Sequence, residues 1–246
     1  MSGLCIKTIA LVSMIVDHAI TAQVITQSFL IRFCHLSLIE SYYLINILQL
    51  FGRVAFPIFS FFIAEGCKRT HCIVEYELRL LLFAMISEIP FDLAVMGSIT
   101  WFYNLNTLFT YTLAVACILI NSVNYGRKGY RVCLTMGMIA VAMVVRSDYS
   151  IYAILMIMVA YYSKRKANAF GGMAGILFTM YVLEPWILNG VLSFDRFILW
   201  GASLLGLVIA YMFNGSYGNI RFRMLFYYAY PIHLTVFAMF RIMRKL

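Results

Sequence analysis

Charged side chains are scarce in this chain of 246 residues. Only 12% of the residues are Asp, Glu, Lys or Arg, against about a quarter in an ordinary soluble domain. Apolar residues make up 63% of the sequence, and the mean hydropathy is +0.89. This composition excludes a soluble globular domain, a disordered chain and a collagen-like fibre. It favours a polytopic membrane protein.

Paired cysteines and metal-ligand clusters are also lacking. The six cysteines form no CxxC pair, and no group of Cys and His has the spacing of a zinc site. We therefore expect neither a bound metal nor a disulfide framework. The first apolar run continues past an Asp-His pair without a small-residue cleavage site, which argues against a cleaved signal peptide.

Acidic residues are half as frequent as basic ones. The chain has 10 Asp and Glu against 19 Lys and Arg, which gives a net charge of +9. In a membrane protein such an excess is typical of cytoplasmic loops, so we do not expect nucleic-acid binding. If the N-terminus is cytoplasmic, the loops between the expected spans carry ten basic residues on that side and three on the other. This predicts a multi-pass protein of the cytoplasmic membrane with its N-terminus inside.

Apolar runs long enough to cross a bilayer recur along the whole chain. They predict an all-α bundle of about nine (8–10) transmembrane helices in a single domain, residues 1–246. The segment 27–43 is expected to be a loop with an amphipathic interfacial piece. The expected spans are 4–26, 44–66, 78–97, 105–122, 131–147, 149–163, 170–188, 196–213 and 222–241.

Polar residues inside the first expected span indicate a functional site. Charged groups in hydrocarbon cost several kcal/mol and usually face the interior of a bundle. Lys7 and His18 are eleven residues apart, so they lie on one helix face, separated by roughly 16 Å along the axis. A cation at the mouth and an imidazole at depth suit a long polar ligand and proton transfer. The alternative is a structural role, which is common for a single histidine.

Other expected spans carry further candidates. Glu88 and Asp92 lie one turn apart around a proline, which suits an acid–base site, a proton path or, as the favoured interpretation, a salt bridge to Arg53. Asn106 and Thr107 open a span and can cap it or donate to a carbonyl. His233 follows a proline in the last span and is a second buried histidine.

These residues fall in blocks that resemble the TraX family, membrane proteins linked to N-terminal acetylation of conjugative pilin. Family members usually carry Gly after the Asp-Tyr pair, where this chain has Ser150. The spacing of Lys7 and His18 also resembles the acyltransferase-3 signature. The blocks are Lys7 with Asp17-His18, Gly52–Phe59 with Glu65-Gly66, Ser87–Asp92, Asn106 with Phe109-Thr110, Asp148-Tyr149 and Tyr230–His233.

The resemblance implies an integral membrane acetyltransferase that uses cytoplasmic acetyl-CoA. Its acceptor would be an amine or hydroxyl, with a pilin-like peptide N-terminus suggested by the family and a glycan or lipid hydroxyl left open. His18 would be the general base, with Asp17 orienting or charging it, and Asn106 would stabilise the oxyanion. The candidate catalytic residues are His18, Asp17, Asn106, Glu88 and Asp148; the candidate coenzyme-binding residues are Lys7, Arg53, Lys68, Arg69, Arg127, Lys128 and His233.

Two other functions remain open from the sequence. A proton-coupled transporter would use the intramembrane acids and His233 as a proton path, although no paired halves with corresponding broken helices are evident. A noncatalytic membrane chaperone for a secreted peptide would use the ion pairs only for packing.

Overall fold

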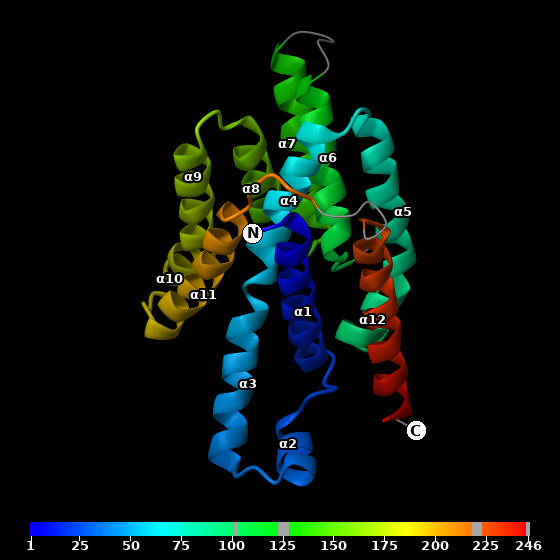
Figure 1. Ribbon diagram of the computed structural model, residues 1–246, viewed down its shortest axis with the longest axis vertical. Coiled ribbons are helices and arrows are strands. Elements are labelled where there is room, and N and C mark those ends of the chain that lie inside the picture. Colours follow the sequence, from blue (N-terminus) through cyan, green and yellow to red (C-terminus); the bar gives the residue numbers. More distant parts are fainter. Residues whose placement is uncertain (101–102, 123–127, 218–222, 245–246) are drawn as a thin grey trace. The chain divides into compact units, whose positions relative to one another are not determined.

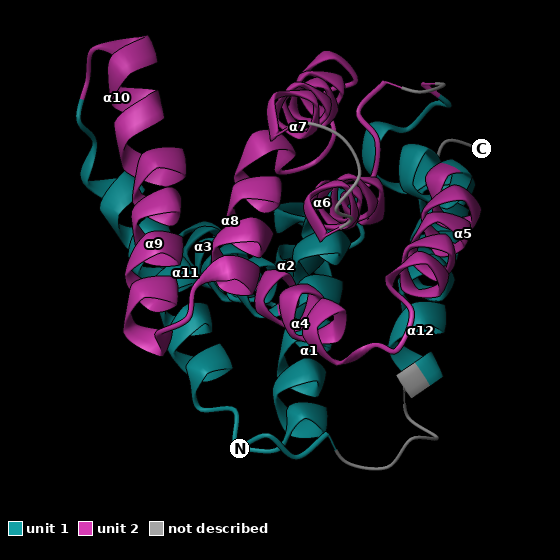
Figure 2. Cartoon of the chain, turned by 90° about the horizontal axis from the view of Figure 1, so that it is seen from above, with its two compact units in different colours: residues 1–58, 89–99, 192–246 teal, residues 59–88, 100–191 magenta. Residues whose placement is uncertain are grey.

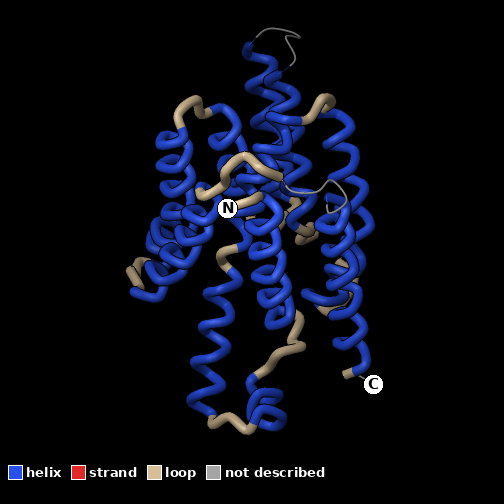
Figure 3. Tube along the Cα trace, in the orientation of Figure 1, coloured by secondary structure: helices blue, strands red, loops and turns tan. Residues whose placement is uncertain are grey.

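The computed structural model describes residues 1–100, 103–122, 128–217 and 223–244. Within these residues the regular secondary structure is entirely helical, as the composition predicts (Figure 3). Besides α-helices, these described residues include two π-helical segments, η1 and η2. π-Helical segments are uncommon, and in them each backbone amide donates to the carbonyl five residues earlier instead of four.

The chain forms two compact units, each built from segments that are distant in sequence (Figure 2). Unit 1 comprises residues 1–58, 89–99 and 192–246, and unit 2 comprises residues 59–88 and 100–191. Unit 1 holds α1 (Gly3–Thr21), α2 (Gln27–Cys34), α3 (Leu38–Gly52), η1 (Asp92–Met96), α11 (Phe194–Tyr211) and α12 (Arg223–Met243). Unit 2 holds most of α4 (Ala55–Arg69) and α5 (Ile73–Phe91), then α6 (Thr107–Ser122), α7 (Lys128–Val144), α8 (Ser150–Tyr162), α9 (Lys166–Phe178), η2 (Thr179–Leu183) and α10 (Glu184–Asn189).

Each expected span overlaps a helix in the described residues, but the expected number of membrane crossings is not established. In the described part of the chain, four helical stretches are long and apolar enough to cross a membrane: Gly3–Thr21, Leu38–Arg69, Lys166–Asn189 and Phe194–Tyr211. Others are too short, since the 13 residues of α8 reach only about 20 Å across a hydrocarbon core of about 30 Å. The long apolar helices indicate a membrane-associated protein.

The segment 27–43, expected to be a loop with an amphipathic interfacial piece, is largely helical. It contains α2 and the first residues of α3. The polar residues that suggested a loop form a capping box, in which the Ser37 hydroxyl accepts from the Glu40 amide and the Glu40 carboxylate accepts from the Ser37 amide at 2.8 Å. The charge of Glu40 therefore marks a helix start.

The long helix that follows is broken between α3 and α4 (Figure 1). Arg53 and Val54 form a turn between Gly52 and Ala55. Pro57 explains the position of the break, because proline cannot donate to the carbonyl four residues earlier and its ring crowds that carbonyl. The break puts non-helical backbone in the middle of an apolar segment of 32 residues.

Within unit 1, α1 and α12 run in the same direction. Lys7 lies near Phe226, His18 contacts His233, and Arg244 reaches the carbonyl of Gln23 beyond the end of α1. Residue numbers therefore increase in the same direction along both helices, so α1 and α12 are parallel. This register places the histidine of the first helix opposite that of the last.

Candidate functional site

Two histidines of unit 1, His18 and His233, form a direct hydrogen bond. Nδ1 of His18 lies 2.7 Å from Nε2 of His233, and the ring planes differ by 12°. Both side chains are buried, with exposed fractions of 8% and 7%. Tyr230 lies edge-on to both rings, and Phe237 packs against His233. An imidazole pair in this apolar setting is held in one arrangement.

The backbone of α12 determines which nitrogen carries each proton. Nδ1 of His233 lies 2.6 Å from the carbonyl oxygen of Ala229, which can only accept a hydrogen bond. Nδ1 of a neutral His233 must therefore be protonated, and its Nε2 presents a lone pair. Nδ1 of His18 then donates to that lone pair, which leaves the lone pair of a neutral His18 on Nε2. The geometry assigns Nε2 of His18 as the basic atom.

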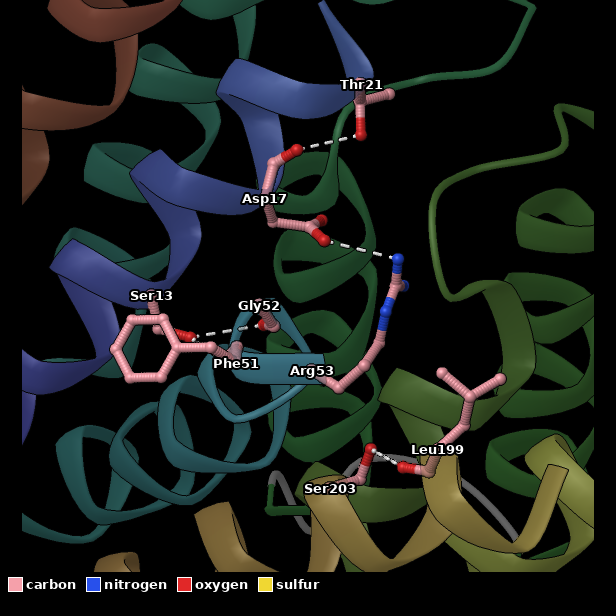
Figure 4. Close-up of polar contacts among 8 residues, drawn as sticks. All are labelled: Ser13, Asp17, Thr21, Phe51, Gly52, Arg53, Leu199 and Ser203. Carbon is pink, nitrogen blue, oxygen red and sulfur yellow. Dashed lines mark hydrogen bonds and ion pairs between the residues drawn. The ribbon is translucent and has the colours of Figure 1, made fainter. Parts of the chain in front are cut away.

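Asp17 contacts a different partner. Its carboxylate lies 3.2 Å from Nη2 of Arg53 (Figure 4), and both side chains are partly buried. Successive residues on a helix point about 100° apart, so Asp17 and His18 project in different directions from α1. The expected partner for His18, Asp17, is thus paired with Arg53, and His233 lies against His18 instead.

Close approach of α1 to α3 requires glycine at position 52. A Cβ atom on Gly52 would lie 2.6 Å from Cβ of Asp17. The Ser13 hydroxyl donates to the carbonyls of Phe51 at 2.5 Å and Gly52 at 3.2 Å, at the end of α3 (Figure 4). These bonds satisfy carbonyls at the break, and they place Asp17 beside Arg53.

Lys7 lies nearer the start of α1. Its ammonium group is 5.7 Å from the ring centroids of both Tyr217 and Phe226, within cation–π range. Because α1 is continuous from Gly3 to Thr21, Lys7 and His18 share its face as expected.

Glu88 and Asn106 meet in unit 2. The side-chain nitrogen of Asn106 donates to Oε2 of Glu88 at 2.6 Å and to the carbonyl of Ala84 at 2.9 Å, and its backbone amide also donates to Glu88. Its side-chain oxygen accepts from the amide of Leu108 at 3.0 Å, which caps α6. Asn106 thus uses both ends of its amide within the protein. Glu88, which with Asp92 was expected to form a salt bridge to Arg53, accepts from Asn106, and Arg53 pairs with Asp17.

Asp148 docks onto the same helix start. The Thr107 hydroxyl donates to its carboxylate at 2.6 Å, and the Thr110 hydroxyl donates to its backbone carbonyl at 2.7 Å. Its amide donates to the carbonyl of Leu105 at 2.9 Å. The threonines were visible in the sequence as polar residues at a helix start, but nothing there paired them with Asp148.

The corner that carries Asp148 has backbone in the left-handed region. Tyr149 has φ of 57° and Ser150 has φ of 35°, a conformation that favours glycine. This explains why the resembling family usually has glycine where this chain has Ser150.

We expect Ser150→Gly to raise the stability of the protein. Relief of the left-handed strain is worth about 1 kcal/mol, which corresponds to roughly 2–4 °C in thermal midpoint. Thermal unfolding in detergent measures the shift. The control is Ser163→Gly at the other end of α8, where φ is −69° and no strain is relieved. An equal or lower midpoint for Ser150→Gly would contradict the explanation.

The remaining candidates lie at helix ends. Lys68 and Arg69 close α4 and contact Glu65 at 3.1 and 3.6 Å. Lys128 begins α7 and is exposed. Arg127 lies outside the described residues. The structure thus gathers His18, His233, Asp17 and Arg53 in unit 1, and Glu88, Asn106 and Asp148 in unit 2.

These features define a membrane-associated protein, entirely helical in its described secondary structure, with a buried histidine pair and a broken apolar helix. The TraX protein family model matches residues 2–241, and the chain belongs to this family. The chain is also similar to a probable fimbrial assembly protein FimC, serogroup H1, of Dichelobacter nodosus, with 24% identity over 96% of this chain and 93% of that protein. No solved structure matches the chain.

Proposed function

We propose that this protein is an integral membrane acetyltransferase of the acyltransferase-3 type. It would transfer the acetyl group of cytoplasmic acetyl-CoA to an acceptor amine or hydroxyl. The observation that carries the proposal is the hydrogen bond between His18 and His233, because it leaves a basic nitrogen on a histidine that is buried and fixed. Such a nitrogen is suited to general-base catalysis.

The proton transfers follow from the tautomers. Nε2 of His18 takes a proton from the acceptor nitrogen or oxygen as that atom attacks the thioester carbonyl carbon. The C–S bond then breaks, and the leaving thiolate takes the proton back from Nε2. His233 is a positioning residue in this scheme, since it holds Nδ1 of His18 and stabilises the imidazolium that forms transiently. His233 thus takes the orienting role that the sequence predicts for Asp17.

The cationic residues support the proposed donor. Lys7 lies on the His18 face of α1. Lys68 and Arg69 at the end of α4, Lys128 at the start of α7, and Arg127, which lies outside the described residues, belong to the side expected to be cytoplasmic. A coenzyme with phosphate groups would be attracted to such a side. The family and the fimbrial relative favour a pilin-like peptide N-terminus as the acceptor, and a hydroxyl would meet the same base.

The proposal is tested with acetyl-CoA labelled on the acetyl group and the full chain in a nanodisc. We expect saturable binding that Lys7→Ala weakens about ten-fold, equivalent to the loss of one phosphate contact worth about 1.4 kcal/mol. A control variant, Lys166→Ala, changes an exposed lysine at the start of α9 and is expected to bind as the wild type does. No binding at millimolar acetyl-CoA in a folded sample would overturn the proposal, and proton-coupled uptake would then be measured.

A further inference from the structure

Two arginines near the end of α12 bind the ends of two other helical segments in unit 1. Nη1 of Arg241 donates to the carbonyls of Ala94 at 2.7 Å and Val95 at 2.6 Å, at the end of η1. Nη1 of Arg244 donates to the carbonyl of Gln23, just beyond α1. Both guanidinium groups thus lie where helix dipoles place partial negative charge.

These arginines also line a pocket of about 190 Å³. Its walls are Ala22, Gln23, Val24, Phe240, Arg241 and Arg244, so it combines apolar surface with two positive charges and has no acidic residue among its described walls. A guanidinium group has five N–H donors, and in the described part of the chain each arginine uses only Nη1. Donors therefore remain for an anionic ligand.

An exposed apolar stripe on α12 leads to the pocket. Ile232, Val236, Met239, Phe240 and Met243 are all exposed. Their spacing of four, three, one and three residues places them on one side of the helix. Phe240 belongs both to the stripe and to the pocket wall. An amphiphile with its chain along the stripe would place its headgroup at the arginines.

We propose that this pocket binds the headgroup of an anionic phospholipid, with an acyl chain lying along the α12 stripe. The phosphate would accept hydrogen bonds from Arg241 and Arg244, and the apolar walls would cover the glycerol region. Basic pockets at the ends of membrane helices have this preference for anionic headgroups. The site lies apart from the proposed transfer chemistry and does not depend on it.

Native mass spectrometry of the detergent-solubilised full chain tests the site. Two probes with identical oleoyl chains, phosphatidylglycerol and phosphatidylcholine, differ in headgroup charge. We expect the wild type to retain phosphatidylglycerol about ten-fold more, and Arg244→Gln to reduce this preference to about two-fold or less. Arg244→Lys, which keeps the charge, should retain most of the preference. Arg244 is the residue to change because it is exposed, whereas loss of Arg241 would also remove the cap of η1.

The matched control is Arg165→Gln, which removes an exposed arginine at the start of α9 in unit 2. It should keep the wild-type preference. Equal retention of both lipids by the wild type, or an unchanged preference in Arg244→Gln, would overturn the proposal. Displacement of phosphatidylglycerol by millimolar inorganic phosphate would also overturn it, because the pocket would then be a site for a free anion.

Discussion

Replacing His18 with alanine is expected to reduce acetyl transfer about 10³-fold, because positioned general bases contribute roughly 10²–10⁴ to a rate. Nε2 of His18 is the basic atom, and His233 is not placed to replace it, because Nε2 of His233 lies against Nδ1 on the other side of the His18 ring and its Nδ1 donates to Ala229. The measurement is release and transfer of label from acetyl-CoA by the variant in a nanodisc. Wild-type turnover by His18→Ala would exclude His18 as the base, and a noncatalytic chaperone would predict only a change in stability.

Variants of His233 separate orientation from packing. In His233→Gln the side-chain oxygen can accept a hydrogen bond from Nδ1 of His18, much as Nε2 of His233 does. We therefore expect the rate of acetyl transfer to fall no more than about ten-fold. His233→Leu keeps the apolar volume but cannot accept, so the loss should approach that of His18→Ala. The nitrogen chemical shifts of His18 report its tautomer, and they should change in His233→Leu but not in His233→Gln. Equal acetyl-transfer rates for His233→Gln and His233→Leu would exclude an orienting role for His233.

Gly206→Ala is expected to destabilise the protein by about 2–3 kcal/mol, the usual cost of overpacking a tight helix contact. The added Cβ would overlap the carbonyl oxygen of Val54 and lie 2.9 Å from Cγ of Pro57. Both groups belong to the break between α3 and α4, so relief requires movement of backbone. Thermal unfolding should show a midpoint lower by roughly 5–10 °C.

The same helix supplies the control. Gly201 lies on an exposed side of α11, and a Cβ there meets nothing within 4 Å. Gly201→Ala should therefore leave the midpoint unchanged or raise it slightly, because alanine favours the helix by up to about 1 kcal/mol over glycine. An equal fall in the thermal midpoint for both variants would show that close contact with Val54 and Pro57 is not the reason for glycine at position 206.

Helix positions were predictable because long apolar runs dominate the sequence. The expected spans 78–97 and 222–241 overlap α5 with η1 and α12, although they contain charged residues and prolines. The π-helical segment η1 was not predictable, since it reflects backbone adjustment after Pro90 and the guanidinium of Arg241, which comes from the far end of the chain. The start of α3 was missed because Glu40 indicated a polar loop.

The candidate site was predictable in its residues but not in its pairs. Lys7, His18 and His233 were chosen because polar groups in apolar spans are costly. Asp17 was expected to serve His18 because the two are adjacent, yet helix geometry turns Asp17 towards Arg53. Pairing across a sequence separation of 215 residues, as in His18 and His233, depends on tertiary packing that no local pattern encodes.

That separation has a consequence for biosynthesis. At about 5–20 residues per second, a ribosome needs roughly 10–40 s to extend the chain from His18 to His233. Throughout this interval α1 has been made, but α12, whose His233 accepts the hydrogen bond from His18, has not yet been completed. A ribosome that stalls before residue 233 therefore releases a product that contains α1 but cannot form the histidine pair. Synthesis must pass His233 before the chain can carry the chemistry proposed here.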